Sequence, residues 1–292
     1  MPFFCIDIGG TNTLIGVGNG DFEVVTRKKT DVFLDDIQGE LKSVLEETDH
    51  GMEDIEETAV AAAGPIDREK GFFRPPNIEK EKVQLRTPLE EIGRVHIVND
   101  CTSAVLGEYF YGDHGSEDLV YITISSGIGA GVIVDGNLAE GWNGNFGEVG
   151  HMTVAGGDMV CGCGGEGHWE AYCSGNSLPE LGEEITGRSF EDAREIFDLY
   201  REGDDGAEKV IERMNEINAR GLANVVDVYN PGKILLGGAV ALNHPEVITG
   251  VEDEVRSAAI NEVPEIEICS LGEKAVIHGL RAVCNGEDLR GA

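Results

Sequence analysis

Basic side chains are scarce in this chain of 292 residues: 22 Lys and Arg stand against 55 Asp and Glu, a formal net charge of −33. A surface of this sign repels nucleic acid and anionic membranes, so neither is expected as a partner. The acidic residues are dispersed along the chain, unlike a disordered acidic tail. Dispersed acidic residues are typical of proteins in a halophile's cytosol, where salt limits the repulsion between their charges to about 3 Å at 1 M. An ordinary acidic protein is the alternative.

Other features are missing as well. The chain has no run of about eighteen apolar residues, which a membrane span needs, and its first residues lack the basic segment of a secretion signal. The seven cysteines are an odd number and mostly scattered, which predicts reduced thiols and a cytoplasmic location. We find no linker or low-complexity tract. Because the length is large for one core, we expect two domains that abut directly.

Metal-ligating residue types are concentrated in one glycine-rich stretch, residues 144–175. It holds His151, Cys161, Cys163 and His168 within about twenty residues, a set that suits tetrahedral zinc. Each of them taken alone is more often a buried thiol or an ordinary histidine. The spacing matches neither a zinc protease nor a nucleobase deaminase, so a structural zinc is predicted. The interleaved Glu148 and Glu170 are not needed by such a zinc, and they indicate a ligand site beside it.

Two segments share a strand, glycine-rich turn and strand pattern. Residues 3–8 form an apolar run, Gly9-Gly10-Thr11-Asn12-Thr13 a tight turn, and residues 14–18 a second strand. Bare backbone N–H groups and a hydroxyl in such a turn can approach a phosphate closely. Residues 120–136 repeat the pattern, with Thr123 at the position of Asp7 and Ser125–Gly127 at that of Gly9–Thr11. We therefore expect a duplicated domain whose halves each offer a phosphate-binding turn to a shared cleft.

Further elements follow from hydrophobic periodicity. Strands are predicted at 58–63, 94–98, 264–269 and from 233 into Gly237-Gly238, and helices at 35–47, 102–109, 190–200, 206–229 and 274–284. One strand delivers Asn99-Asp100 at its carboxyl end, where open α/β sheets bind ligands. Asp100 capping the following helix is the alternative. The Gly237-Gly238 turn allows a flat ring to lie on the backbone.

Together these segments resemble the ROK (repressor, open reading frame, kinase) sugar kinases, within the actin-like ATPase architecture. The resemblance covers essentially the whole chain. It is carried by residues 7–13, 98–100, 125–131, 147–151 and 161–170. It implies an α/β, ribonuclease H-like fold with two duplicated domains around a cleft. The domains are expected at 1–112 and 113–277, with a helix at about 278–292 packing back onto the first.

The resemblance implies transfer of the γ-phosphate of ATP to a hexose. Glucose, giving glucose 6-phosphate, is the first expectation, with fructose, N-acetylmannosamine and N-acetylglucosamine left open. Asp100 is then the base on the acceptor hydroxyl, and the sugar ring is held by Gly64, Asn77, Asn99, Asp100, Glu148, His151 and Glu170. ATP and Mg²⁺ are assigned to Asp7, Gly9, Gly10, Thr11, Asn12, Ser126 and Gly127, and adenosine to Gly237 and Gly238. The family's third zinc cysteine is His168 here, which zinc accepts. We expect a homodimer or homotetramer.

Two other classes of function compete with a kinase. ROK regulators respond to sugars and carry an N-terminal helix-turn-helix, whereas here the first predicted strand begins at Phe3 and the charge opposes DNA binding. A non-catalytic actin-like scaffold is the other, and the retention of Asp7 and Asp100 argues against it. ATP consumption with mixed hexoses separates the kinase from both.

Overall fold

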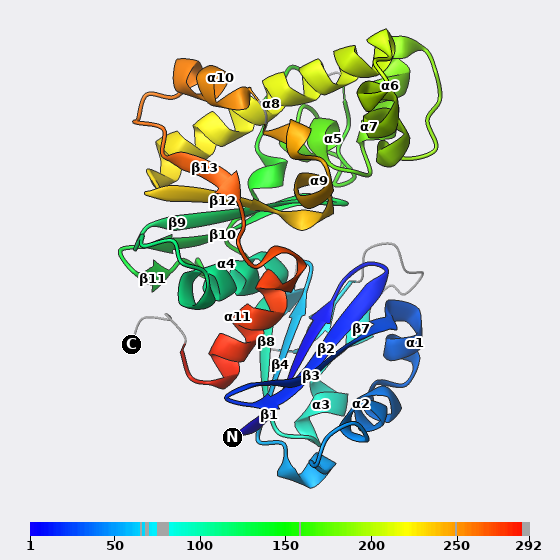
Figure 1. The fold of residues 1–292 in the computed structure, drawn as a ribbon, viewed down its shortest axis with the longest axis vertical. Helices are drawn as coiled ribbons and strands as arrows, with labels where there is room; N and C mark the ends of the chain where they lie inside the picture. Colours follow the sequence, from blue (N-terminus) through cyan, green and yellow to red (C-terminus); the bar gives the residue numbers. More distant parts are fainter. Residues whose placement is uncertain (65, 68–69, 75–81, 158, 249, 288–292) are drawn as a thin grey trace. The chain divides into compact units, whose positions relative to one another are not determined.

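The computed structural model describes residues 1–64, 66–67, 70–74, 82–157, 159–248 and 250–287 (Figure 1). The chain divides into two compact units. The first comprises Met1–His114, Asn137–Phe146 and Lys274–Ala292, and the second Gly115–Gly136 and Gly147–Glu273. Among the described residues, no helix has both the length and the apolar character needed to cross a membrane.

The first unit is built on a five-stranded mixed sheet of order β3-β2-β1-β4-β8. Its strands are β1 (Pro2–Ile8), β2 (Asn12–Asn19), β3 (Asp21–Lys29), β4 (Glu57–Ala62) and β8 (Arg94–Asn99). Only β2 runs against the others, because it pairs antiparallel with both β1 and β3, while β1, β4 and β8 are parallel. The carboxyl ends of β1, β3, β4 and β8 therefore lie at one edge of the sheet.

Alternation along the strands separates the two faces of this sheet. Phe4, Ile6 and Ile8 belong to a core shared with α1 (Thr30–Asp35), α2 (Ile37–Leu45) and α3 (Arg86–Glu90). The sequence predicted one helix at 35–47. The structure breaks it at Asp36, whose side chain accepts a hydrogen bond from Gly39 N and starts α2.

The opposite face is covered by two helices far apart in the sequence, α4 (Asp100–Tyr111) and α11 (Ala275–Cys284), which pack on each other (Figure 1). A small sheet of β5 (Ile66–Asp67), β6 (Phe72–Phe73) and β7 (Val83–Gln84) also belongs to this unit.

A second five-stranded mixed sheet has the order β11-β10-β9-β12-β13. Its strands are β9 (Leu119–Ile124), β10 (Ile128–Val134), β11 (Asn137–Leu138), β12 (Lys233–Gly237) and β13 (Glu265–Ile268). As in the first sheet, the central hairpin is antiparallel and the strands that follow are parallel. Asp7 and Thr123 occupy equivalent positions in the two hairpins, because each belongs to the last residue pair but one before the turn. The predicted duplication is confirmed, and the fold is of the α/β actin-like class.

The second unit is rich in helices. They are α5 (Trp169–Cys173), α6 (Leu178–Thr186), α7 (Ala193–Arg201), α8 (Asp205–Tyr229), α9 (Gly238–Asn243) and α10 (Val251–Ala258). Short 3₁₀ segments of this unit lie at 149–151 and 245–247; two others lie at 52–54, in the first unit, and at 272–274, where the chain passes from the second unit to the first. The long helix α8 begins where the Asp204 carboxylate accepts hydrogen bonds from Gly206 N and Ala207 N, an N-cap. It ends at Asn230, which has the left-handed conformation with φ of 46°. Helices α5, α6, α7 and α10 pack against it.

Candidate functional site

The first glycine-rich turn, Gly9–Asn12, lies at the carboxyl edge of the first sheet. Gly9 N donates to Asn12 O at 3.1 Å, which closes the turn. Thr30, fully buried, fastens it from the end of β3: its N donates to Thr11 O at 3.1 Å and its Oγ1 to Gly9 O at 2.8 Å. Thr30 was not among the predicted site residues, because the sequence pattern did not predict strand β3. The turn itself stays accessible, which a phosphate-binding role requires.

Two carboxylates stand beside this turn. Asp7, near the end of β1, and Asp100, the first residue of α4, are both half-buried. Burial, followed by the charge of Asp100, raises the pKa of Asp7 to about 7, while the charge of Arg27 opposes the rise. Burial likewise raises the pKa of Asp100, and hydrogen bonds from Cys101 limit that rise. Acidic groups with raised pKa values at a sheet edge are typical of functional sites.

Asn99 and Asp100 have different hydrogen-bonding roles at the start of α4. The Asn99 Oδ1 accepts hydrogen bonds from Cys101 N at 2.9 Å and Thr102 N at 3.1 Å, so Asn99 is the N-cap. Asp100 Oδ1 accepts from Cys101 N at 2.8 Å. The capping role considered for Asp100 therefore belongs to Asn99. The amide Nδ2 of Asn99 is a donor that the cap does not use.

Two other residues predicted to bind the sugar belong to the first unit. Gly64 is half-buried and follows the end of β4 by two residues, at the same edge as Asn99. Asn77 lies outside the described residues.

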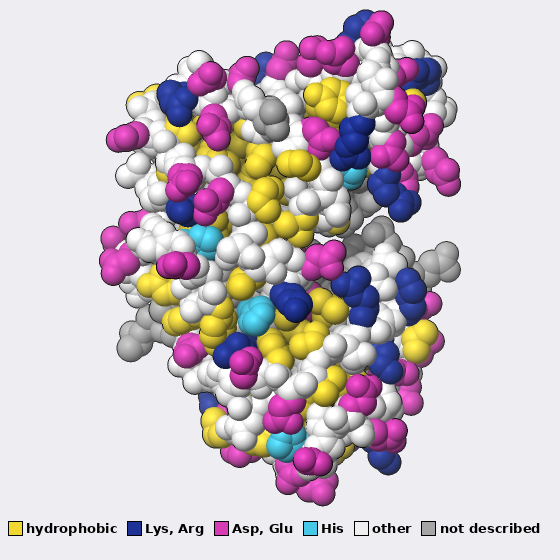
Figure 2. Space-filling model, viewed as in Figure 1, with side chains coloured by type: hydrophobic (Ala, Val, Ile, Leu, Met, Phe, Trp, Pro, Cys, Tyr) yellow, Lys and Arg dark blue, Asp and Glu magenta, His cyan; other side chains and the backbone are white. Residues whose placement is uncertain are grey.

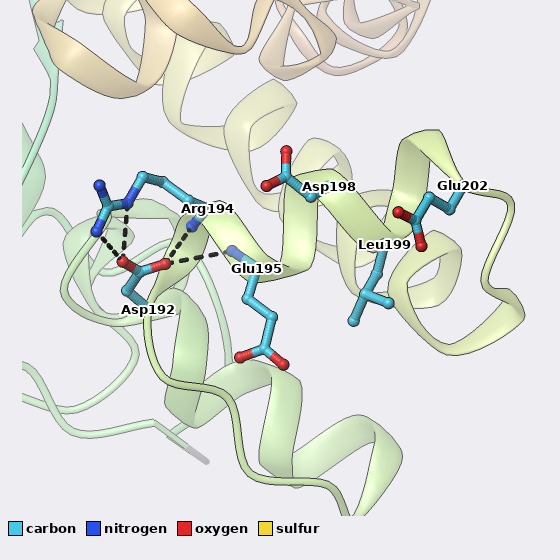
Figure 3. A pocket seen from close by; sticks show the side chains of 6 residues that line it. All are labelled: Asp192, Arg194, Glu195, Asp198, Leu199 and Glu202. Atoms are coloured by element: carbon cyan, nitrogen blue, oxygen red, sulfur yellow. Dashed lines mark hydrogen bonds and ion pairs between the residues drawn. The ribbon is translucent and has the colours of Figure 1, made fainter.

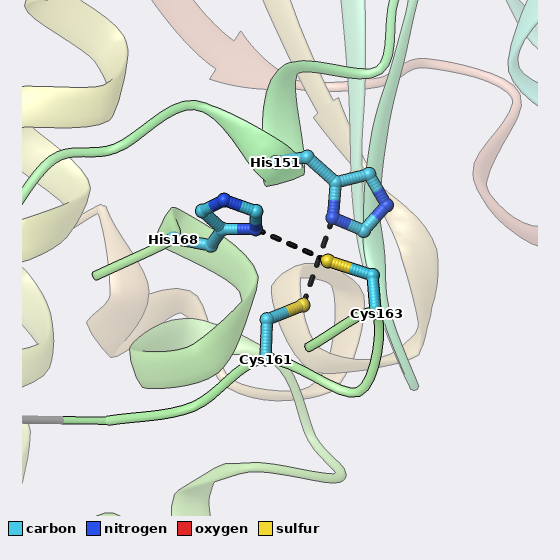
Figure 4. Close-up of side chains that lie close together, drawn as sticks. All are labelled: His151, Cys161, Cys163 and His168. Carbon is cyan, nitrogen blue, oxygen red and sulfur yellow. Dashed lines mark hydrogen bonds between the residues drawn. The ribbon is translucent and has the colours of Figure 1, made fainter. Parts of the chain in front are cut away.

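In the second unit, the four predicted metal ligands converge. The side chains of His151, Cys161, Cys163 and His168 point toward one another, and their ligand atoms all lie within 4.8 Å of one another (Figure 4). His151 Nδ1 is 3.6 Å from Cys161 Sγ, and His168 Nδ1 is 3.3 Å from Cys163 Sγ. Cys161 is buried and Cys163 exposed, so the cluster opens on one side.

The geometry of this cluster fits a tetrahedral ion. Zinc bonds of about 2.3 Å to sulfur and 2.0–2.1 Å to nitrogen place the S and N ligands about 3.6 Å apart. The two measured S–N distances are close to that value. Burial raises the pKa of the Cys161 thiol to about 12, and the Glu170 carboxylate contributes to the rise. A metal that binds here must displace that proton, which a divalent cation does.

Trp169 anchors the cluster to the long helix α8. Its ring is fully buried, and its Nε1 donates to Asn218 Oδ1 at 2.8 Å. A β-carbon at Gly221 would lie 2.3 Å from the ring, so glycine is required where Trp169 meets α8. His168 and Glu170, on either side of Trp169 in the sequence, are thereby held in place.

The second glycine-rich turn, Ser125–Gly127, is tied to the metal cluster by one carboxylate. Glu170 Oε2 accepts a hydrogen bond from Ile128 N at 2.9 Å, and Glu170 Oε1 accepts one from Cys161 Sγ at 3.4 Å. Glu170 was predicted as a sugar ligand, and the sequence did not indicate these protein partners. Its other predicted sugar carboxylate, Glu148, is exposed, with Oε2 3.7 Å from Nε2 of His151.

Gly237 and Gly238 form the junction of β12 and α9. Gly238 has φ of +84°, and a β-carbon there would lie 2.5 Å from Thr123 Oγ1. The junction therefore sits directly beside the strand that leads into Ser125–Gly127. Within the second unit, the predicted adenosine turn and the second phosphate turn adjoin the same strand, β9.

Comparison with known proteins decides the family, since a model of the ROK family matches residues 3–285. The chain belongs to the ROK family. A glucokinase from Aeropyrum pernix is 31% identical to this ROK protein over 97% of both chains.

Two solved structures share the fold. A ROK hexokinase from Thermus thermophilus has a TM-score of 0.85 and 30% identity, covering 98% of this chain and 99% of its own. A ROK glucokinase from Streptomyces griseus, in complex with glucose and AMPPNP, has a TM-score of 0.80 and 25% identity, covering 98% of this chain and 100% of its own.

One further hollow of this ROK protein lies away from these residues. It has a volume of about 460 Å³ and is open along α7, lined by Asp192, Arg194, Glu195, Asp198, Leu199 and Glu202 (Figure 3). Its only cation, Arg194, is paired with Asp192. Four carboxylates on the outer side of an amphipathic helix are a solvated surface, and we assign no chemistry to it.

Proposed function

We propose that this ROK protein is an ATP-dependent sugar kinase, which transfers the γ-phosphate of ATP to a hexose hydroxyl. The observation that carries the proposal is the placement of Asp7 and Asp100 beside Gly9–Asn12, at the carboxyl edge of one sheet. Phosphoryl transfer needs positioning, neutralisation of charge and one base, and this edge offers groups for each. The similarity to a glucokinase and a hexokinase over nearly the whole chain supports it.

Asp100 is the proposed general base. Its carboxylate would take the proton of the attacking sugar hydroxyl as the bond to phosphorus forms. Burial raises the pKa of Asp100, which makes the ionised form a stronger base than an exposed aspartate. The position at the start of a helix, with Cys101 N donating to Oδ1, fixes the direction of this carboxylate.

Asp7 is the proposed partner of Mg²⁺, which would arrive with ATP. A divalent cation prefers carboxylate oxygens and would favour the ionised form of Asp7, against the effect of burial. The backbone N–H groups of Gly10–Asn12 and of Ser126 and Gly127 suit phosphate oxygens, whereas those of Gly9 and Ser125 close the two turns. The Gly237-Gly238 junction suits adenosine, because it lacks side chains over the backbone.

Glucose is the proposed acceptor, as in the glucose-bound relative. Asn99, Gly64 and Asn77 of the first unit, and Glu148, His151 and Glu170 of the second, are the proposed sugar ligands. Fructose, N-acetylmannosamine and N-acetylglucosamine are the alternatives, which differ in the substituent at C2 or in ring form.

Zinc is the proposed occupant of the cluster of His151, Cys161, Cys163 and His168, because the S–N distances and the donor types fit it. Its role is structural: it would fix the loop that carries Glu148 and Glu170. We also propose a homodimer or homotetramer, and a reducing, cytoplasmic setting, with which seven free cysteines agree. The dispersed acidity is proposed to adapt the chain to molar salt.

A panel of hexoses with coupled detection of ADP tests this proposal. Wild-type protein in molar salt should release ADP only when a sugar is present, fastest with glucose. ADP release without any sugar, or none with the whole panel, would contradict the kinase. Faster turnover of an N-acetylhexosamine or fructose would retain the kinase and replace glucose.

A further inference from the structure

The end of β3 concentrates positive charge in a strongly acidic chain. Arg27, Lys28 and Lys29 are consecutive, although the whole chain has only 22 basic residues. Because β3 runs in the direction of β1, this end lies at the edge that carries the turn Gly9–Asn12, and Lys29 pairs directly with Asn12. Figure 2 shows acidic side chains scattered over the visible surface and a group of basic ones where β3 runs into α1.

The register of the sheet assigns these cations to its two faces. Directly paired residues of neighbouring strands share a face. Asp7 pairs with Leu14 and Leu14 with Arg27, so Arg27 lies on the face of Asp7. The charge of Arg27 opposes the rise in the pKa of Asp7, which agrees with this placement. Lys29, two residues further along β3, lies on the same face.

Lys28 lies on the opposite face and has a different task. Its Nζ is 2.9 Å from Glu40 Oε2 and donates to Ser43 Oγ at 3.1 Å, so it holds β3 against α2. It is a matched control for its neighbours: it has the same charge and the same strand but faces away from Asp7.

Thr30, the residue after β3, holds the end of this strand against the turn through two hydrogen bonds. Its hydrogen bonds to Thr11 O and Gly9 O, at 3.1 and 2.8 Å, come directly after Lys29 in the chain. The backbone that carries these two exposed cations is therefore held beside a turn whose backbone N–H groups suit an anion.

We propose that Arg27 and Lys29 bind the terminal phosphate of the donor nucleotide. This inference rests on the proposed kinase function. A triphosphate that approaches Asp7 and Asp100 meets two carboxylates, which repel it unless cations compensate. Arg27, on the face of Asp7, presents the planar fork of donors that matches phosphate oxygens, and Lys29 adds a point charge. The terminal phosphate is the one beside the base, so these cations act on ATP more than on ADP.

The test compares nucleotide binding in three variants that keep the aliphatic stems. Arg27→Met with Lys29→Met is the double variant, Lys28→Met is the control, and Arg27→Lys retains the charge without the fork. Dissociation constants for MgATP, MgADP and glucose are measured by calorimetry on the full chain, and melting curves verify folding. The double variant should bind MgATP at least about 10-fold more weakly, as expected for lost bonds to a charged group. It should bind MgADP and glucose within about 3-fold of wild type.

The controls separate the possible results. Lys28→Met should bind MgATP like wild type, and Arg27→Lys should fall between wild type and the double variant. Equal losses for MgATP and MgADP, or a loss in Lys28→Met as large as in the double variant, would overturn the role at the terminal phosphate. If wild type phosphorylates a hexose and the double variant binds MgATP normally, this inference fails and the kinase stands. If wild type binds no MgATP and phosphorylates no hexose, both fail.

Discussion

Glu170 Oε2 lies 2.9 Å from Ile128 N, while Oε1 of the same carboxylate lies 3.4 Å from Sγ of Cys161. One side chain thus joins the metal cluster to the end of the turn Ser125–Gly127. The bond from Ile128 N to this charged acceptor is stronger than a neutral one and should hold the turn in place. The bond from Cys161 Sγ needs the protonated thiol, so binding of a metal to the thiolate should break it.

Replacement of Glu170 should loosen this turn. In Glu170→Ala the amide of Ile128 loses its acceptor, and its hydrogen exchange should accelerate by at least about 10-fold. Exchange measured by mass spectrometry or NMR over residues 125–130 tests this. Glu166→Ala, which removes a carboxylate from the same loop, should leave that segment unchanged. Normal protection of Ile128 in Glu170→Ala would refute the link.

His168 variants test the metal cluster. His168→Cys should retain zinc, because three thiolates and one imidazole also suit a tetrahedral ion. His168→Ala should lower zinc affinity by roughly 10-fold or more and raise the KM for sugar through disorder of Glu148 and Glu170. Elemental analysis and sugar kinetics provide the two measurements. Wild-type protein purified without zinc, or normal sugar binding in His168→Ala, would contradict a zinc that fixes this loop.

The pKa of Asp7 has a consequence for stability. Burial raises this pKa from 3.8 to about 7, so the folded protein holds the proton more tightly than the unfolded chain. The resulting stabilisation is complete below pH 3.8 and is lost as the pH rises through 7. Asp7→Asn should therefore raise the melting temperature at pH 8 without Mg²⁺ and have little effect near pH 4. Asp31→Asn, an exposed control, corrects for the change in net charge; an equal gain in both variants would contradict the raised pKa.

Salt should stabilise the fold. The chain has 55 acidic and 22 basic residues, so its negative charges repel one another. This repulsion extends over about 10 Å at 0.1 M salt but over only about 3 Å at 1 M. The melting temperature should rise from 0.1 to 2 M potassium chloride, and activity should fall on dialysis into dilute buffer. An unchanged melting temperature across that range would speak against adaptation to salt.

The sequence predicted the parts of the fold in which a local residue pattern also marks a functional site, namely the glycine-rich turns and the metal cluster. The apolar runs before Gly9 and Ser125 identified β1 and β9, and with them the duplication that the two sheets confirm. The ligand types at 151–168 identified a cluster that the structure brings together. Chemistry restricted to a few residue types at short spacing can be read without tertiary information.

Other features depend on tertiary contacts. Strand β3 alternates half-buried and exposed residues, many of them charged, so its pairing with β2 decides its structure. Thr30 became recognisable only through its bonds to Gly9 and Thr11, and Glu170 through its bond to Ile128. The pairing of α4 with α11, which lie far apart in the sequence, leaves no local signal.

The most direct test of the account is the turnover of Asp100→Asn with MgATP and glucose. As the base, Asp100 must be ionised, and its raised pKa should move the acid limb of the wild-type kcat/KM profile above that of an exposed aspartate. The variant should lose at least about 10²-fold in kcat while its dissociation constant for MgATP stays nearly unchanged. Formation of sugar phosphate, followed with γ-labelled ATP, gives the rate. Turnover of Asp100→Asn close to that of wild type would contradict the account.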